Sequence, residues 1–398
     1  MFLPLWLLLA AASLPHVSAR VCTPEGAFFD ISTQEALDSF TNNCTAANST
    51  LRFGTNYTDS LVLPNITNVT GDIEITASDR LESIEIPDVE HLSGLWISEA
   101  LNLARISLPK VRYIENVYLN TSAASPVLEL PLLERVDSLL LYGNWSSMAF
   151  DALHTVNDTL FVCQDEQCDP DTAPERSMDI SFPALKQING RAEFGGNIAN
   201  LSLPELVTTA SHMNIYHLGP ILNPSLPKLD TVENLDFQGN ISTIELPSIQ
   251  KLDMFQCYTD EPLSLNLPAE TAQYIYIDVP SIKSLSFPNL TNSSAVSIRS
   301  DEAYDCDKLH KSIRVDVQHD IIFYCDVPSS SGLSTGAKTG IGVGVGIAGL
   351  GLIGLAVVFW LRRRAKKKER GSHAEEQKMA AMGAGSGSDD SGKSLRSL

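Results

Sequence analysis

Residues 106–131 read ISLPKVRYIENVYLNTSAASPVLELP, a segment framed by two apolar–proline steps. Counted from Pro109 as zero, apolar side chains return at +2, +5, +8 and +10, and an apolar-x-apolar pair precedes the next proline. These positions are Val111, Ile114, Val117, Leu119, Leu128 and Leu130. Because the pairs have a period of two, the segment predicts at least two short strands in each turn of a repeat.

The same apolar–proline step recurs along most of the chain. Successive steps lie 20 to 23 residues apart, except for a gap of 52 residues after Pro131, where Phe150 and Asp151 take the place of a missing proline and an insertion follows. A repeat of this length predicts a solenoid. The ten steps are Leu63–Pro64, Ile86–Pro87, Leu108–Pro109, Leu130–Pro131, Phe182–Pro183, Leu203–Pro204, Leu226–Pro227, Leu246–Pro247, Leu267–Pro268 and Phe287–Pro288.

Proline has no N–H and holds the preceding residue in the extended region, so it ends a strand at the same corner of every turn. Scattered X-Pro loops would not keep the apolar positions in register, and here only the turns after Pro64, Pro183 and Pro204 hold one extra residue. We expect an all-β fold, a right-handed parallel β-helix or leucine-rich-repeat-like solenoid of about eleven short coils, and a rod about 50 Å long.

The two ends of the chain predict a type I single-pass membrane protein. Residues 1–19 have the apolar run and small-residue exit of a signal peptide. Residues 340–361 are uncharged and mostly apolar, and the basic cluster that starts at Arg362 predicts a cytoplasmic C-terminus. A GPI signal is disfavoured because 37 residues follow Leu361. The predicted location is the plasma membrane, with the ectodomain outside.

The predicted segments are a signal peptide (1–19), an N-terminal cap with a short helix (20–62), a solenoid with its C-terminal cap (63–325, insertion at about 163–177), a linker (326–339), a transmembrane helix (340–361) and a basic, disordered tail (362–398). The glycine pairs Gly340/Gly344 and Gly342/Gly346 could join two helices into a homodimer or simply belong to a glycine-rich span. The basic cluster is either a stop-transfer signal or a site for inner-leaflet lipid.

Charge separates along the chain in the same way. The net charge is −20, and residues 362–398 carry 10 basic and 5 acidic side chains, so the net charge of the remainder is −25. Such an acidic ectodomain is a poor candidate for binding nucleic acid or an anionic polymer.

Twelve N-x-Ser/Thr sequons also indicate an extracellular chain, and none of them falls on an inward position of the repeat. They begin at Asn43, Asn48, Asn56, Asn65, Asn68, Asn120, Asn144, Asn157, Asn200, Asn240, Asn289 and Asn292. Gly143 and Gly239 precede two of them, Asn144 and Asn240, which also match the asparagine of the leucine-rich-repeat pattern. A surface turn is the better interpretation there.

Six of the seven cysteines lie close together in the sequence in pairs, although six cysteines allow fifteen pairings. Neighbourhood favours Cys22 with Cys44, Cys163 with Cys168, and Cys306 with Cys325. The spacing from Ser32 to Glu35 predicts a capping box that opens the helix of the N-terminal cap. Cys257 occupies an inward +10 position, so a buried free thiol is favoured over a reactive or intermolecular one.

With its cysteine-bracketed cap, its Leu-x-Leu-Pro coils, its sequons and a Gly/Ser-rich linker, the chain resembles fungal cell-wall organisation proteins of the Ecm and sporulation-specific type. Their ectodomain is similar to the receptor L domains of insulin-receptor-like proteins. The resemblance covers about residues 20–330 and implies a role in wall integrity without catalytic residues. The best-known members are GPI-anchored, so the spanning helix predicted here departs from them and favours retention at the plasma membrane.

An enzyme is not expected, because the acidic residues and the six ectodomain histidines are dispersed along the sequence. The acidic loop around Cys163 and Cys168 could bind calcium, but a solvated disulfide loop is favoured, so no cofactor and no metal are predicted. Two function classes stay open. One is a wall-organising or adhesive surface protein, and the other is a receptor whose tail recruits cytosolic partners.

The outward residues of the second strand suggest where a ligand binds. Trp96, Tyr118 and Leu140 stand at equivalent positions of successive turns and would form an exposed apolar ladder. The series continues at Leu160 or Phe161. The outward positions of the other strand, from Val62 to Ser286, are mostly polar. A cell-wall glycan or a surface protein is the expected partner, unless the insertion folds back over the ladder.

Overall fold

The computed structural model describes residues 20–54, 57, 59–76, 80–121, 125–165, 168, 176–313 and 322–328. They belong to a compact unit, Met1–Pro328, and the second unit, Ser329–Leu398, lies outside them. The predicted signal peptide, the predicted transmembrane helix with its glycine pairs, nearly all of the linker, the basic tail and Asn56 are outside the described residues. Within the described ranges, no helix is long and apolar enough to cross a membrane.

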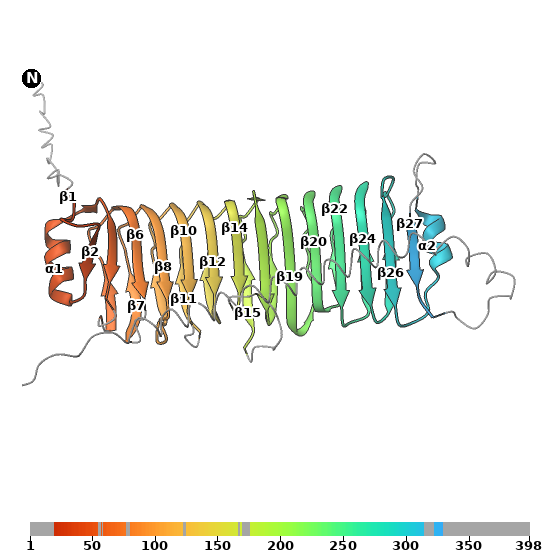
Figure 1. Ribbon diagram of the computed structural model, residues 1–398, viewed down its shortest axis with the longest axis horizontal. Helices are drawn as coiled ribbons and strands as arrows, with labels where there is room; N and C mark the ends of the chain where they lie inside the picture. Colours follow the sequence, from red (N-terminus) through yellow and green to blue (C-terminus); the bar gives the residue numbers. More distant parts are fainter. Residues whose placement is uncertain are drawn as a thin grey trace, which may run out of the picture. The chain divides into compact units, whose positions relative to one another are not determined.

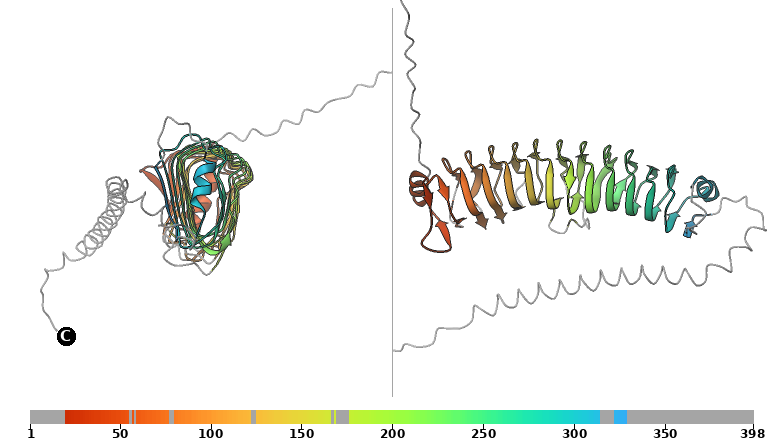
Figure 2. Two further views of the ribbon diagram at one scale, coloured as in Figure 1. Left: turned by 90° about the vertical axis from the view of Figure 1, so that its right-hand side faces the viewer. Right: turned by 90° about the horizontal axis from the view of Figure 1, so that it is seen from above.

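The described residues form an all-β, parallel solenoid, as the repeat predicts, with about 12 turns where about eleven were expected. Each full turn contributes one long strand to a broad sheet and a shorter strand to the opposite side. The strands pair in parallel on both sides. Figure 1 shows the long strands side by side, and Figure 2 shows the turns superimposed as a flattened coil when they are viewed along its axis.

The broad sheet, which we call the long sheet, has 17 strands among the described residues. They are β1 (Val21–Cys22), β2 (Phe28–Ile31), β3 (Ala46–Ala47), β4 (Thr50–Phe53), β6 (Asn68–Thr76), β8 (His91–Ser98), β10 (Tyr113–Asn120), β12 (Arg135–Tyr142), β14 (Thr155–Cys163), β16 (Gln187–Ile188), β17 (Arg191–Gly196), β19 (Thr208–Leu222), β20 (Thr231–Ile241), β22 (Lys251–Thr259), β24 (Thr271–Val279), β26 (Ala295–Ser300) and β27 (Ile322–Asp326).

The shorter strands form three smaller sheets in the described part of the chain. They are β5 (Asp59–Val62), β7 (Leu81–Glu85), β9 (Arg105–Ser107), β11 (Val127–Glu129) and β13 (Ser147–Ala149), then β15 (Met178–Ser181) and β18 (Ile198–Ser202), then β21 (Thr243–Glu245), β23 (Leu263–Asn266) and β25 (Ile282–Ser286). Single bridges at Ser225 connect β18 with β21. The outward column from Val62 to Ser286 is thereby paired as predicted along most of its length.

The core lies between the two sides and consists of the inward residues of the repeat. All six inward positions of the segment after Pro109 are fully buried. Phe150 occupies the same position as Phe182, and the two rings stack with their centroids 5.1 Å apart. Leu153 N–H donates to Phe150 O at 3.3 Å, and Leu185 N–H donates to Phe182 O at the same distance. The turn without a proline therefore keeps the corner of the others.

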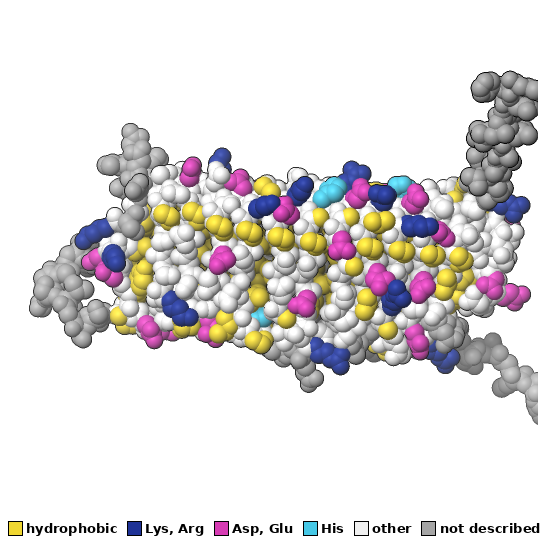
Figure 3. Space-filling model, turned by 180° about the vertical axis from the view of Figure 1, so that it is seen from behind, with side chains coloured by type: hydrophobic (Ala, Val, Ile, Leu, Met, Phe, Trp, Pro, Cys, Tyr) yellow, Lys and Arg dark blue, Asp and Glu magenta, His cyan; other side chains and the backbone are white. Residues whose placement is uncertain are grey.

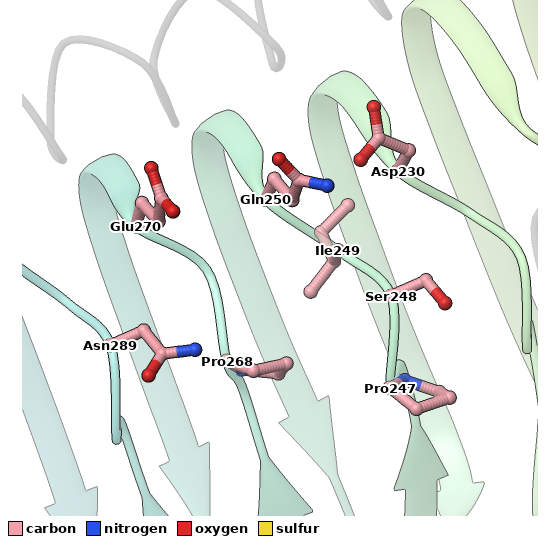
Figure 4. Close-up of a pocket in the computed structure, with 8 residues that line it drawn as sticks. All are labelled: Asp230, Pro247, Ser248, Ile249, Gln250, Pro268, Glu270 and Asn289. Carbon is pink, nitrogen blue, oxygen red and sulfur yellow. The ribbon is translucent and has the colours of Figure 1, made fainter.

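The prolines end the shorter strands on the side opposite the long sheet, which we call the proline face. Figure 4 shows Pro247 and Pro268 at the ends of such strands, with the long strands behind them. All ten repeat prolines are half-buried or exposed. Figure 3 shows this face, where apolar side chains form a line along the rod between scattered charged groups.

One extra residue in some turns produces a bulge in the long sheet. The register shifts between Val69 and Asp72 and between Thr209 and His212, in turns where the sequence predicts an insertion. The turn after Asp151 also holds an extra residue, because Ser138 pairs with Thr159 whereas Val136 pairs with Val156. Leu160 is consequently buried, and Phe161 faces outward.

Caps close both ends of the core, each with a short helix (Figure 1) and a disulfide. Helix α1 (Gln34–Asn43) lies beside Cys22–Cys44, whose Cα atoms are 5.6 Å apart, and α2 (Cys306–Ser312) begins at Cys306–Cys325, at 6.4 Å. The predicted pairs, including Cys163–Cys168, are confirmed. The predicted capping box at Ser32 is wrong. Thr33 caps α1, because its side chain accepts from Ala36 N–H at 3.2 Å.

The remaining cysteine and the sequons agree with the repeat. Cys257 is a fully buried free thiol that pairs in register with Phe237 and Ile277, and burial raises the pKa of the thiol far above its ordinary range. None of the eleven sequon asparagines in the described residues is buried. Gly143 has a φ of +128° and lies in a bend, as predicted before Asn144, whereas Gly239, with a φ of +92°, and Asn240 lie within β20, so the turn predicted there is not found.

Candidate functional site

An aromatic stack lies on the outer side of the long sheet, on strands β8 and β10. Tyr118 pairs directly with Trp96 on one side and with Leu140 on the other, so the predicted ladder is a continuous column. The rings of Trp96 and Tyr118 stack, with centroids 5.4 Å apart and planes 25° apart. Phe161 follows Leu140 in the same column. We call these four residues the aromatic ladder.

Trp96 is the exposed residue of the aromatic ladder, and the other three are partly covered. The Trp96 side chain is 42% exposed, and Tyr118, Leu140 and Phe161 are half-buried. The latter three pack against a small apolar cluster of Tyr142, Cys163 and Cys168 that lies outside the main core. The ladder is therefore open at its Trp96 end and partly covered at the other.

The cover comes from the disulfide loop of the insertion. Cys168 has a φ of +48° and lies over Gly195, where an added Cβ would be 3.2 Å from the Cys168 Cβ. Cys163 is fully buried beside Tyr142, whose ring centroid is 5.8 Å from that of Tyr118. The ladder is thus a continuous column as predicted, and in the described residues the predicted covering by the insertion is found at Cys163 and Cys168, beside the Phe161 end.

Glycine at position 94 makes room for the exposed end of the ladder. An added Cβ at Gly94 would lie 2.7 Å from Trp96 Nε1 and 2.3 Å from Asp72 Oδ1. The indole therefore lies over the β8 backbone, with a carboxylate beside its polar edge. Burial and, secondarily, the charge of Glu74 raise the pKa of Asp72 above its ordinary value. A larger residue at position 94 would displace the ring.

An ion pair between Arg52 and Glu74 borders the Trp96 end of the ladder. Arg52 Nε donates to Glu74 Oε2 at 2.8 Å, and its guanidinium lies 3.8 Å from the centre of the Phe28 ring. Glu74 is the register neighbour of Trp96. The border is thus polar without a large excess of positive charge, which suits a neutral ligand with hydroxyl groups better than an anionic one.

One sequon lies directly beside the ladder. Asn120 follows Tyr118 by two residues on β10, so both side chains are on the outer side of the sheet, and its register neighbours are Ser98 and Tyr142. A glycan on Asn120 would border the ladder without entering the core. The side-chain amide of Asn240, in contrast, is already engaged in the fold, because its Nδ2 donates to Gly219 O at 2.8 Å across the corner of the coil.

The proline face offers a different kind of surface. A shallow hollow there is lined by Asp230, Pro247, Ser248, Ile249, Gln250, Pro268, Glu270 and Asn289 (Figure 4). Its polar side chains come from successive turns, and no aromatic ring lines it. No cluster of three or more metal-ligating side chains occurs in the described part of the chain. The aromatic ladder is therefore the better candidate for a binding site.

Sequence reasoning missed other aromatic residues of the same sheet. Tyr142 escaped notice because it lies in the next outward column, two residues beyond Leu140. Three further exposed tyrosines, Tyr258, Tyr274 and Tyr324, lie on β22, β24 and β27 at the far end. An alternation count over all outward columns, in place of one, would have found the first two of them.

Comparison with known proteins found no matching family model, no matching curated protein and no matching solved structure. No relative therefore assigns a role to any residue of this surface.

Proposed function

We propose that this chain is a non-catalytic cell-surface glycoprotein that binds cell-wall glycan through the outer side of its long sheet. The observation that carries the proposal is the stack of Trp96 on Tyr118, which leaves a large aromatic surface exposed on a rigid strand pair. Exposed apolar patches on soluble proteins usually mark interaction sites, and aromatic residues are enriched among the residues that contribute most to binding.

The neighbours of the stack favour a sugar over an apolar protein surface. An aromatic ring can pack against the C–H face of a pyranose, while the hydroxyl groups at its edge need hydrogen-bonding partners. Asn116 and Asn120 flank Tyr118 on the outer side of β10, and Asp72 on the neighbouring strand β6 pairs with Gly94, two residues before Trp96. The acidic character of the chain, with a net charge of −20, argues against an anionic polymer.

The proposal includes the place where this binding acts. The resemblance to fungal wall-organisation proteins, together with the predicted anchor at 340–361, favours an ectodomain held at the plasma membrane and directed into the wall. A parallel β-solenoid with a disulfide in each cap is consistent with the receptor L-domain-like ectodomain of that family. In this role the rod would organise glycan by holding it.

The test is a sedimentation assay with the purified full chain and insoluble wall polysaccharides: β-1,3-glucan, chitin and mannan. We expect wild type to sediment with at least one of them. Trp96→Ser should reduce the affinity about tenfold, the effect of a typical aromatic hot spot. Tyr118→Ser should weaken binding less, because this ring is already half-buried.

Leu132→Ser is the matched control. Leu132 follows Pro131 on the proline face and is 42% exposed, like Trp96, so it removes a similar fraction of exposed apolar surface elsewhere. All three variants should melt within a few degrees of wild type. Equal loss of binding in the Trp96 and Leu132 variants, or no binding of wild type to any polysaccharide, would contradict the proposal.

A further inference from the structure

A second aromatic group lies on the outer side of the long sheet, at the end distant from Trp96. It consists of Tyr258 on β22, Tyr274 and Tyr276 on β24, and Tyr324 on β27, which we call the tyrosine patch. Tyr258, Tyr274 and Tyr324 are 37%, 43% and 47% exposed. The ring centroids of Tyr258 and Tyr276 are 5.2 Å apart. Among the described residues, three of the four exposed large aromatic side chains therefore belong to this patch, and the fourth is Trp96.

Small side chains lie between the rings of the tyrosine patch. Ser297 on β26 pairs with Tyr276 on one side and with Tyr324 on the other, and Ala295 pairs with Tyr274 and Ile322. Large side chains thus stand on both sides of Ala295 and Ser297, the two small outward residues of β26. The two flanking strands are about 9.6 Å apart, twice the strand spacing, so the rings on them border a strip of smaller side chains.

Polar groups complete this second surface as they do the first. Arg299 lies two residues after Ser297 and bonds to Asp278 Oδ2 at 3.3 Å, with Asp326 Oδ2 at 4.0 Å from its Nε. Burial, followed by the charge of Asp278, raises the pKa of Tyr276, so its hydroxyl stays protonated and can donate. The patch therefore combines aromatic faces with donors and acceptors and has no unpaired excess of charge.

The aromatic ladder and the tyrosine patch share one column of the sheet. Register pairs run from Trp96 through Phe161 to Tyr276 without a break. Eight strand steps separate Trp96 from Tyr276, which corresponds to about 38 Å at the usual spacing. Cys168 lies over Gly195, one column to the side. A chain laid along the rod would therefore meet both surfaces on the same line.

The stretch between the two surfaces is polar. After Phe161 the column continues with Glu193, Asn214, Asp236 and Gln256. Asn214 Nδ2 donates to Glu193 Oε1 at 3.4 Å. Gln238 Nε2 donates to Asp236 Oδ2 at 2.8 Å. Asp236 is buried and the Glu193 side chain is only 12% exposed, so a polymer that followed this column would contact chiefly Asn214 and Gln256, which are half-buried. A partner protein that covered this length would need a matching apolar centre, which the stretch does not offer.

We propose that the tyrosine patch is a second carbohydrate-binding site, and that it and the aromatic ladder hold one extended neutral polysaccharide chain along the rod. This inference rests on the proposed function of the ladder. Two weak sites on one rigid body bind a long chain more tightly than either binds a short one, because the second contact is intramolecular. The rod would in this way select polymer over fragment.

The experiment measures the affinity of the purified full chain for linear β-1,3-glucan and chitin oligosaccharides of increasing length. We expect a step of at least tenfold in affinity once the oligosaccharide exceeds about 38 Å. The double variant Tyr274→Ala/Tyr324→Ala should lose this step and keep the wild-type affinity for short oligosaccharides. Trp96→Ser should weaken the binding of both short and long oligosaccharides.

The control is the double variant Leu132→Ala/Val207→Ala. It removes two exposed apolar side chains that do not lie on the outer side of the long sheet. It should keep the step, and unfolding temperatures should be similar in all variants because the substituted residues are exposed. A smooth length dependence without a step, or a step that survives the tyrosine substitutions, overturns the second site and leaves the first intact. Absence of wild-type binding at every length overturns the proposed function itself, as does binding to a wall protein alone.

Discussion

The outer side of the long sheet and the proline face are made by the same repeat, yet they carry different surfaces. Figure 1 shows the two sets of strands, and Figure 3 shows the surface of the proline face. In the described part of the chain, the exposed large aromatic residues all belong to the long sheet. On the opposite side, Arg105 lies between Glu85 at 3.7 Å and Glu129 at 2.7 Å, one rung away on either side. Packing dictates only the inward positions, so the two outward faces are free to differ. One of them suits binding and the other suits solubility.

A core substitution has the largest expected effect and breaks the comparison, because it removes support common to both faces. Phe182 is fully buried and stacks on Phe150, so Phe182→Ala should lower the free energy of unfolding by about 3–5 kcal/mol. Urea unfolding of the full chain measures it. Val62→Ala, at an outward position of the same side, should cost under about 0.5 kcal/mol. Similar costs for the two variants would mean that the register is wrong.

Opening the disulfide loop sharpens the comparison by exposing more of the aromatic ladder. Replacing both Cys163 and Cys168 with serine should cost about 2 kcal/mol, the value expected for so short a loop. Tyr118, Leu140 and Phe161 should become more exposed, because they pack against the disulfide cluster. Tyrosine accessibility to a soluble quencher or modifying reagent checks this. The account of the cover fails if that accessibility stays at the wild-type level.

A buried histidine makes the stability of the long sheet depend on pH. His217 is fully buried, accepts from Ile198 N–H through Nδ1 at 3.2 Å and contacts Pro220 O through Nε2, so the neutral ring has a partner on both sides. Burial lowers its pKa below the ordinary 6.5.

The sign of the effect follows from proton binding. As the pH falls below about 6.5, the unfolded chain takes up a proton at this position and the folded chain does not, so stability decreases. The loss is complete once the pH is below the folded pKa. His217→Gln should reduce the pH slope of the unfolding free energy between pH 7 and 5. An unchanged slope would contradict the assignment.

The smallest expected effect concerns the ion pairs of the proline face. Arg105 is about half exposed, and the water around it screens its attraction to Glu129, so Arg105→Ala should leave the unfolding temperature unchanged within error. The same variant should sediment with wall polysaccharide like wild type. A clear loss of binding in this variant would mean that the polysaccharide binds the proline face, which would contradict the proposed binding face.

Much of the fold was predictable because the apolar–proline step recurs at a nearly constant interval, and the inward apolar residues recur at fixed distances from it. That signal placed Cys257 in the core, assigned Phe150 to the turn without a proline, and kept every described sequon out of the interior. The prediction failed at the start of the first helix, where two neighbouring residues could each act as the N-cap. Thr33 caps the first helix in place of Ser32, since capping depends on which hydroxyl reaches the free N–H, and neighbouring hydroxyl residues look alike in a sequence.

The candidate site was predictable only in part. The adjacency of Trp96, Tyr118 and Leu140 follows from the period, but the choice between Leu160 and Phe161 required the bulge at Val156 to be located. The cover over Tyr142 depends on how an irregular loop folds, which no repeat encodes. Tyr324 lies 36 residues after Pro288, the last proline of the repeat, where counting no longer gives the register.

Hydroxyl-radical footprinting of the full chain, with and without insoluble β-1,3-glucan or chitin, tests the central claim most directly. Oxidation rates at Trp96 and Leu132 are compared, because these side chains are equally exposed and lie on different sides of the rod. We predict that bound polysaccharide protects Trp96 and leaves the rate at Leu132 unchanged. Protection of Leu132 with Trp96 still fully reactive would contradict the assignment of the binding face.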